Sequence, residues 1–497
     1  MGVYGYVFLD NDSWSPTVNM CPKINGMRSF YAFGRVTAAF MSGILAADLA
    51  VGAEEATNSL SAPSITGQPL QEQTWNWHVQ NTDIVQGYPA FPAKYTGPNS
   101  LPSGGEIRET VSLDLFGGVR LWGGAEAHID GLMWQGFGFN NTLGAEGFPN
   151  GEGYRIGTQV PNGMIARLFI RQTIGLGGEQ EDVADDQLTL AGKQDVSRLT
   201  FTLGRMSSGD IFDQNAYANS PRTQFMNWGL VNNEAWDYAA DAVGYTTGLA
   251  VELNQPKWTL RYGVFQEPKI ANNLTGDDAI FKWPYDSAAG YAPVLSAWAM
   301  TAEFERRYTI NNHPGAIRFL AFLNRADMFR YDEATALLQA NGAGADLSAA
   351  RAFRLKYGFG LNLEQEIMKN IGLFSRLGWN DGNEQGWMFT DVDYAGSLGL
   401  SVKGEAWHRP DDTFGVAGVM NGITHTEQAF FAAGGTGILA GDGNLNYGWE
   451  KILETYYNIK IWKTIHASVD YQFITDPAFN RDRGPVSVFG ARLHWEF

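Results

Sequence analysis

The last nine residues of the chain, 489–497, read FGARLHWEF and decide its fold. Apolar side chains, three of them aromatic, stand at the odd positions. Gly490, Arg492, His494 and Glu496 stand between them. Successive side chains of a β-strand point to opposite faces, so this segment is predicted to be a strand with one apolar face and one polar face.

The same alternation recurs through the preceding four hundred residues. Residues 74–80, 199–203, 258–264 and 357–363 each place apolar and polar side chains on opposite faces. About sixteen such segments follow one another, at the roughly ten-residue length typical of membrane barrels. The chain is therefore predicted to be all-β, a transmembrane antiparallel β-barrel of about sixteen strands. The predicted strand centres lie near residues 77, 113, 122, 168, 201, 247, 261, 302, 320, 359, 375, 399, 416, 453, 468 and 491.

The connections between these segments alternate in length, as expected for short periplasmic turns and longer extracellular loops. The short connections are predicted at 116–118, 254–256, 311–314 and 461–463. The long connections are predicted at 82–108, 129–162, 206–240, 267–295, 326–352 and 421–445. Residues 175–197 are long where a short turn is due, and the pattern gives no reason for it.

A secreted β-sandwich, β-helix or propeller would also alternate, because its apolar face points to a shared core. Three features favour the barrel. The loops alternate between long and short, the polar face carries the Arg, Glu, Lys, Asn and Gly expected of a wet lumen, and the chain ends on Phe497. Outer-membrane barrels often end on an aromatic residue.

Composition excludes several classes of protein. The 497 residues carry a formal net charge of −18, so the basic surface of a nucleic-acid binder is absent. Charged residues make up 18%, against roughly 25% in soluble domains, and aromatic residues make up 13%, too many for a disordered chain. Repeated apolar runs of about 20 residues, which a bundle of membrane helices needs, are not found past the N-terminal region.

The N-terminal region resembles an export signal. The apolar stretch 36–53 follows Arg28 and Arg35 and ends on small residues before Glu54, the pattern of a cleaved signal peptide. A membrane anchor is the alternative. The predicted organisation is an N-terminal extension and signal peptide at 1–53, a periplasmic segment at 54–73, and a porin-like barrel domain at 74–497.

Several stretches resemble the carbohydrate-selective porins of the Gram-negative outer membrane, the OprB family. The most specific are residues 409–417, RPDDTFGVA, and residues 476–485, DPAFNRDRGP. Residues 204–206, 218–228 and 378–382 match as well. The resemblance implies a single-domain, sixteen-stranded barrel in the outer membrane that passes sugars, notably glucose, by passive diffusion. Residues 1–26 match nothing in the family.

In many porins the third extracellular loop folds inward and narrows the lumen, and by analogy loop 206–240 is expected to do so here. Aromatic faces suit sugar rings, and charged or amide groups suit sugar hydroxyls. Alternatively, these aspartates cap turns, the tryptophans pack, and the arginines form ion pairs across the wall. The candidate residues of the loop are Asp210, Asp213, Arg222, Trp228, Trp236, Asp237 and Tyr238, and those on or near strands are Arg205, Arg261, Arg318 and Arg376.

Signals for catalysis or cofactors are weak. The seven histidines lack a metal-ligand spacing, and neither a Walker loop nor a G-x-S-x-G elbow occurs. Glu303 and Glu305 share one strand face, as a glycosidase pair could, but adjoining Arg306 and Arg307 favour ion pairs in a lumen. The expected protein is not an enzyme, and it has no cofactor, no metal and no catalytic residues.

The expected partners are outer-membrane lipid and small sugars, without nucleic acid, and a homo-oligomer is left open. The alternatives are a general diffusion porin without sugar preference and a secreted β-rich glycan-binding protein.

Overall fold

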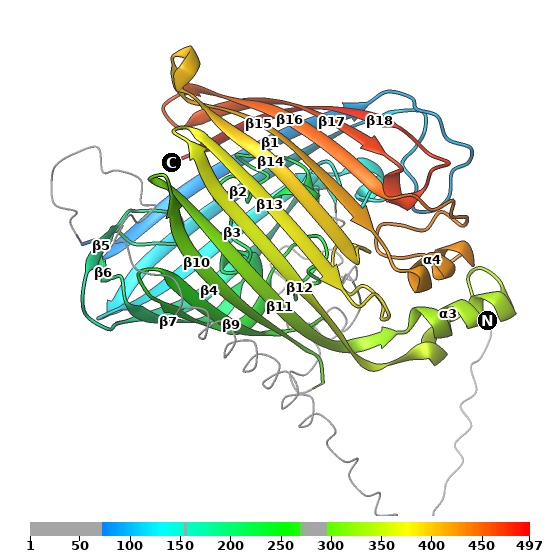
Figure 1. Cartoon of the computed structure of the whole chain (residues 1–497), viewed down its shortest axis with the longest axis horizontal. Helices are drawn as coiled ribbons and strands as arrows, with labels where there is room; N and C mark the ends of the chain where they lie inside the picture. Colours follow the sequence, from blue (N-terminus) through cyan, green and yellow to red (C-terminus); the bar gives the residue numbers. More distant parts are fainter. Residues whose placement is uncertain (1–71, 154–156, 269–270, 272–295) are drawn as a thin grey trace, which may run out of the picture. The chain divides into compact units, whose positions relative to one another are not determined.

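Residues 72–153, 157–268, 271 and 296–497 are described by the structure, a computed structural model. Sixteen strands within these ranges close into one antiparallel barrel (Figure 1). The barrel strands are β1 (Trp75–Tyr88), β2 (Glu106–Trp122), β3 (Ala125–Gly136), β4 (Thr158–Gly175), β7 (Arg198–Met206), β8 (Thr246–Asn254), β9 (Trp258–Gln266), β10 (Trp298–Ile310), β11 (His313–Phe329), β12 (Arg351–Met368), β13 (Ile371–Asn380), β14 (Tyr394–Gly404), β15 (Arg409–Gly422), β16 (Glu450–Trp462), β17 (Ile465–Thr475) and β18 (Val486–Glu496).

The predicted N-terminal extension and signal peptide lie outside the described residues, as does all of segment 54–73 except its last two residues. Most of the predicted loop 267–295 also lies outside them.

The last strand closes the barrel, as its sequence suggests. β18 pairs antiparallel with both β17 and β1, and each strand between them pairs with its neighbours in chain order once the small β5–β6 sheet is set aside. At the end of the chain, the Phe497 amide donates to the carbonyl of Val79 at 2.8 Å. The Phe497 ring lies 5.3 Å from the ring of Trp77. Because β1 and β18 pair with each other, the sheet formed by the described barrel strands closes without a free edge.

The two faces of each strand follow the predicted alternation. In β12, the side chains of Lys356 and Asn362 are buried inside the barrel, whereas Tyr357 is exposed on the outer wall. The ring of Phe359, also on the outer face, stacks on Trp379 of β13 at 5.8 Å. Apolar residues on the outer wall suit lipid and polar residues inside suit water, which accounts for the near-zero mean hydropathy of the chain.

One predicted turn is wrong. Residues 116–118 lie inside β2, so the expected strand centres at 113 and 122 belong to one strand, and the true turn is Gly123-Gly124 before β3. A Cβ at position 118 would lie 2.4 Å from the Asn76 Oδ1 atom and 2.9 Å from the His128 ring. Gly118 therefore lets two inward side chains approach the strand backbone rather than marking a turn.

The connections at one end of the barrel carry most of the irregular structure. They include the short helices α2 (Trp228–Val231), α3 (Tyr331–Asn341) and α4 (His425–Ala432) and the 3₁₀ turns η1 (Phe139–Asn141), η2 (Ser208–Asp210), η4 (Ser348–Ala350) and η6 (Pro477–Phe479). α3 and α4 lie side by side, with the Tyr331 and Phe430 rings 5.2 Å apart (Figure 1). Among the described residues, no helix has the length and apolar character needed to cross a membrane.

The opposite end has short turns, apart from η5 (Glu405–Trp407) and one long segment. Residues 176–197, between β4 and β7, contain a two-stranded hairpin of β5 (Gln180–Val183) and β6 (Gly192–Asp195). This is the segment whose length the sequence pattern leaves unexplained. By the rule that periplasmic turns are the short ones, this end faces the periplasm.

Candidate functional site

Loop 207–245, between β7 and β8, crosses the inside of the barrel. At its tip, the Asp213 carboxylate accepts hydrogen bonds from Arg376 Nε at 2.9 Å and from Asn362 Nδ2 at 2.7 Å. The Asp213 amide donates to Glu303 on another part of the wall at 2.8 Å. Further along, the Met226 amide donates to Glu454 of β16 at 2.6 Å. The loop is therefore fixed to strands on widely separated parts of the wall.

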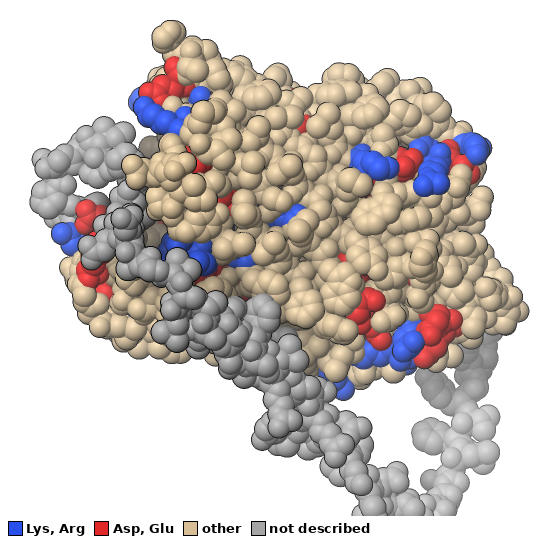
Figure 2. Space-filling view, viewed as in Figure 1, with Lys and Arg blue, Asp and Glu red and all other residues tan. Residues whose placement is uncertain are grey.

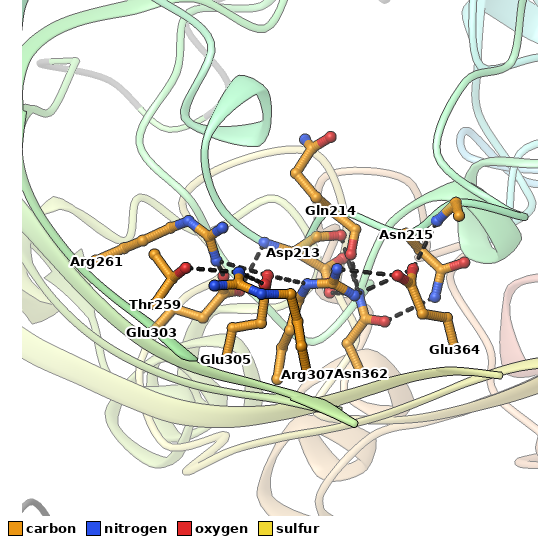
Figure 3. A network of polar contacts seen from close by, with 12 residues as sticks. Asp213, Gln214, Asn215, Thr259, Arg261, Glu303, Glu305, Arg307, Asn362 and Glu364 are labelled. Atoms are coloured by element: carbon orange, nitrogen blue, oxygen red, sulfur yellow. Dashed lines mark hydrogen bonds and ion pairs between the residues drawn. The ribbon is translucent and has the colours of Figure 1, made fainter. Parts of the chain in front are cut away.

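Behind the loop tip, the wall arginines are paired with wall carboxylates (Figure 3). Arg261 contacts Glu303 at 2.7 Å and Glu305 at 3.1 Å. Arg318 contacts Glu305 at 2.9 Å and Glu364 at 3.2 Å. Because this network also receives the loop backbone, its charges hold the loop in place rather than facing open water.

The preceding loop, 137–157, also reaches across the lumen in its described part. The amides of Glu146 and Gly147 donate to the Glu450 carboxylate of β16, at 3.1 and 2.8 Å. Two glutamines of the barrel wall, Gln86 and Gln472, donate to the Pro149 carbonyl, each at 2.8 Å. Two loops of the long-loop end therefore narrow the barrel together.

A third loop, 381–393, is tied to the first through Asp237. The Asp237 carboxylate accepts from the Trp387 amide at 2.9 Å and from the Met388 amide at 2.7 Å. Burial raises the pKa of Asp237, although Lys356, 3.7 Å away, and the two amides favour the ionised form. Asp237 thus links two loops that lie far apart in the sequence.

The loops leave a central cavity of about 400 Å³. Aromatic rings line it, and four of them, from three loops, pack together: Phe148, Trp228, Tyr238 and Phe389. The Phe148 and Trp228 rings are stacked at 5.0 Å and 16°, and the Tyr238 and Phe389 rings at 4.9 Å and 29°. Trp228 lies 5.3 Å from Phe389, so the four rings form one continuous group.

Two arginines with carboxylate partners line the same cavity. Arg167 of β4 contacts Asp210 through Nε and Nη2, at 2.8 and 2.7 Å. Arg222 of the loop contacts Glu152 at 3.0 Å, and both of these residues also line the cavity. Behind them, Arg167 pairs with Asp130 of β3 at 2.6 Å. The cavity therefore combines aromatic faces with fixed donors and acceptors.

The residues singled out from the sequence fall into two groups. Asp210, Asp213, Arg222, Trp228 and Tyr238 line the central cavity. The remaining candidates do not line it: Arg205, Trp236, Asp237, Arg261, Arg318 and Arg376.

The residues of the second group hold the loop and the wall. Arg205 donates to the Ile165 carbonyl at 2.9 Å and pairs with Asp241 near the loop end. The Trp236 ring is buried 5.0 Å from the Tyr238 ring. Arg261 also lines a second cavity at the periplasmic end.

Sequence reasoning missed several residues of the cavity, among them Phe148, Glu152, Arg167 and Phe389. Arg167 has a signal, because it falls on the polar face of its strand. The other three stand in loops without periodicity, and only contacts between distant loops bring them to the cavity. Within the part of the chain that the structure describes, no group of three or more potential metal ligands is arranged to hold an ion.

The family model described as "Carbohydrate-selective porin, OprB family" matches residues 99–497. The high-pH structure of OprB from Pseudomonas putida is similar, with a TM-score of 0.64 and 15% sequence identity, covering 85% of this chain and 94% of that chain. The outer-membrane channel DcaP of Acinetobacter baumannii gives a TM-score of 0.45 and 10% identity, covering 85% of this chain and 97% of that chain. A search of curated proteins finds no match.

Proposed function

Because the chain belongs to the OprB family of carbohydrate-selective porins, we propose that sugars cross its barrel through the central cavity between loop 207–245 and the wall strands β1 and β4. The protein is an outer-membrane channel for passive sugar diffusion.

The observation that carries the proposal is the composition of the cavity wall. A sugar presents flat, weakly apolar ring faces and a girdle of hydroxyl groups. The Trp228 and Phe389 rings offer aromatic faces to the sugar ring. The Arg222–Glu152 and Arg167–Asp210 pairs offer donors and acceptors to its hydroxyl groups. A volume of about 400 Å³ also suits a small molecule, because such sites range from about 300 to 1,000 Å³.

The ion pairs also explain how binding can remain weak enough for transport. Each arginine of the cavity already has a carboxylate partner, so a hydroxyl group competes with an existing contact and gains little net free energy. A conducting site needs affinity high enough for entry and low enough for release. Paired charges beside aromatic faces satisfy both conditions.

Liposome swelling with glucose and with mannitol tests the proposal, because mannitol is an open-chain polyol without a ring face. We expect wild-type channels to pass glucose faster than mannitol. Trp228→Ala should lower this preference about two- to tenfold, since aromatic contacts contribute about 0.5–1.5 kcal/mol. The matched control is Trp379→Ala, on the outer face of β13, which should keep the wild-type ratio. Equal swelling in both solutes for wild-type channels would contradict the proposal.

We further propose that transport involves no chemical step and no cofactor. The paired carboxylates Glu303 and Glu305, which a glycosidase would use, are engaged by Arg261. Disaccharides recovered after passage through reconstituted channels should be intact.

We also propose that export removes residues 1–53, leaving 54–73 as a periplasmic segment before β1. The basic residues, the apolar stretch and the small residues before Glu54 support this. N-terminal sequencing of protein purified from outer membranes should begin at Glu54, and a chain that retains residues 36–53 would contradict it.

A further inference from the structure

The hairpin segment 176–197 stands out because it occupies the lumen from the periplasmic end. It joins β4 to β7, where the other connections of that end are short. Figure 1 shows β5 and β6 at the same end of the barrel as the C-terminus. Its tip, residues 184–191, extends past β3 and β2 and reaches β1, three strands away from β4 in the barrel.

Hydrogen bonds fix the tip to the inner face of β1. Asn76 Nδ2 donates to the Asp185 carboxylate at 2.8 Å and to the carbonyls of Asp186 and Thr189 at 3.1 and 3.0 Å. His78 Nε2 lies 3.2 Å from the same carboxylate. Both partners lie on the polar face of β1, so the tip lies inside the lumen against the part of the wall formed by β1–β4.

A second set of contacts comes from β4 and from the residue Gln73, just before β1. Arg171 of β4 donates to the Leu188 carbonyl at 2.8 Å. The Gln73 amide donates to the Ala191 carbonyl at 3.0 Å, and the Ala191 amide returns a bond to the Gln73 side chain at 2.7 Å. Held from both sides, the tip is a built element of the channel rather than a loose loop.

The tip separates two cavities. Gln187 and Leu188 line the central cavity of about 400 Å³ together with Arg167 and Arg222. The next two residues, Thr189 and Leu190, line a cavity of about 660 Å³ at the periplasmic end. A solute that leaves the central cavity toward the periplasm therefore meets the tip of the hairpin.

Gln187 has the chemistry of a sugar contact. Its Nε2 group donates to Gln80 Oε1 at 2.9 Å and lies 3.4 Å from the Glu496 carboxylate. Gln80 in turn approaches Asp114, the wall partner of Arg222, at 3.4 Å. Within the described part of the chain, the side-chain oxygen of Gln187, Oε1, accepts no hydrogen bond. It is therefore free to accept one from a sugar hydroxyl.

We propose that the tip of this hairpin is a second constriction of the sugar path, that Gln187 contacts the passing sugar, and that the tip limits the size of sugar that leaves on the periplasmic side. This inference rests on the route proposed above, with the extracellular loops forming the upper constriction and the hairpin the lower one.

Cysteine modification tests the inference, in a Cys21→Ser background that removes the only cysteine of the sequence. Gln187→Cys channels treated with a bulky thiol-specific reagent should lose glucose flux by roughly tenfold, since a narrowed filter governs passage. The matched control is Glu179→Cys, which is exposed near the base of the hairpin and lines neither cavity. After the same treatment it should keep its flux.

Mass spectrometry must confirm the label in both variants. Full labelling of Gln187→Cys with unchanged glucose flux would overturn the inference while leaving the proposed route intact. Wild-type channels that show no preference for glucose would instead overturn the route.

A second variant tests the size limit without a label. Replacing Gln187 and Leu188 by glycine keeps the loop length and opens the tip, so a trisaccharide should pass several-fold faster relative to glucose. The ratio of trisaccharide to glucose flux staying at the wild-type value would also overturn the inference.

Discussion

Asp213 fixes loop 207–245 to the barrel wall. Its carboxylate is the ion-pair partner of Arg376, whose side chain is only 2% exposed. The Arg376 guanidinium also donates to the Leu230 carbonyl at 2.9 Å, so one wall residue holds two points of the loop. A buried charge that loses its partner typically costs about 3–5 kcal/mol.

Asp213→Ala should therefore release the loop tip while the barrel remains folded. We expect a larger and noisier single-channel conductance and protease cleavage within residues 207–245. Asp346→Ala, at an exposed aspartate whose carboxylate accepts hydrogen bonds from Ser348, is the control and should behave as wild type. Unchanged conductance and protease resistance in the Asp213 variant would show that the tip does not depend on this pair.

Asp185 makes the hairpin sensitive to strong acid. Burial acts to raise the pKa of Asp185, but hydrogen bonds from Asn76, Gln73 and His78 outweigh it and hold the pKa below the ordinary value of 3.8. Because the pKa is depressed, the ionised carboxylate stabilises the docked tip at any pH above the ordinary pKa of 3.8. This stabilisation is lost as the pH falls through the lower pKa that Asp185 has in the docked tip.

Trisaccharide flux should accordingly stay at its neutral-pH level down to about pH 4 and rise only below it. The Asp185→Asn variant should lack this acid-dependent step, because its side chain does not titrate. A rise of flux near pH 6 in the wild type would show that another group controls the tip.

At the scale of elements, alternation predicts most strands but misses β3, most of which falls in the predicted connection 129–162, and it predicts the loops poorly. The pattern predicts correctly which side chains of β12 and β18 face lipid and which face the lumen, because lipid-facing residues are apolar and lumen-facing residues are polar. It fails at 116–118, where glycine serves close packing in β2 rather than a turn. Loop 206–240 is expected inside the lumen by analogy, and the structure places it there.

The partners of the loop cannot be predicted from the sequence. Arg222 meets Asp114 from 108 positions away, and Arg376 meets Asp213 from 163 positions away. No local periodicity encodes such a pair, because it arises only once the barrel has closed. The sequence pattern can therefore identify the arginines that point into the barrel. It cannot show which of them line the cavity and which belong to the network on the wall.

The link between loops 207–245 and 381–393 gives a prediction at this scale. Asp237→Ala removes the acceptor of the Trp387 and Met388 amides, and each buried unpaired group costs about 1–3 kcal/mol. We expect loop 381–393 to move, carrying Phe389 away from Tyr238 and weakening the glucose preference in liposome swelling. Asp332→Ala, at an exposed ion pair with Arg330, serves as the control. A retained glucose preference in the Asp237 variant would show that the link does not position Phe389.

For the whole molecule, closure between β1 and β18 is the condition for stability. Every backbone hydrogen-bonding group in the lipid region must find a partner within the sheet, since lipid offers none. Removing residues 489–497 should abolish the heat-modifiable form of the protein on gels, because β1 and β17 would both be left as open edges. Phe497→Ala, which keeps the strand, should retain it. A heat-modifiable truncated protein would contradict the closed-barrel account.

Planar-bilayer recording with glucose tests the central claim most directly. The account predicts that glucose reduces the channel current in a saturable manner, because the sugar occupies the cavity lined by Trp228 and Arg222. The glucose concentration for half-block should rise by roughly two- to tenfold in Trp228→Ala, and also rise in Arg222→Lys, where a point charge replaces a planar group that holds both Asp114 and Glu152. Stable channels whose current no sugar alters would contradict it.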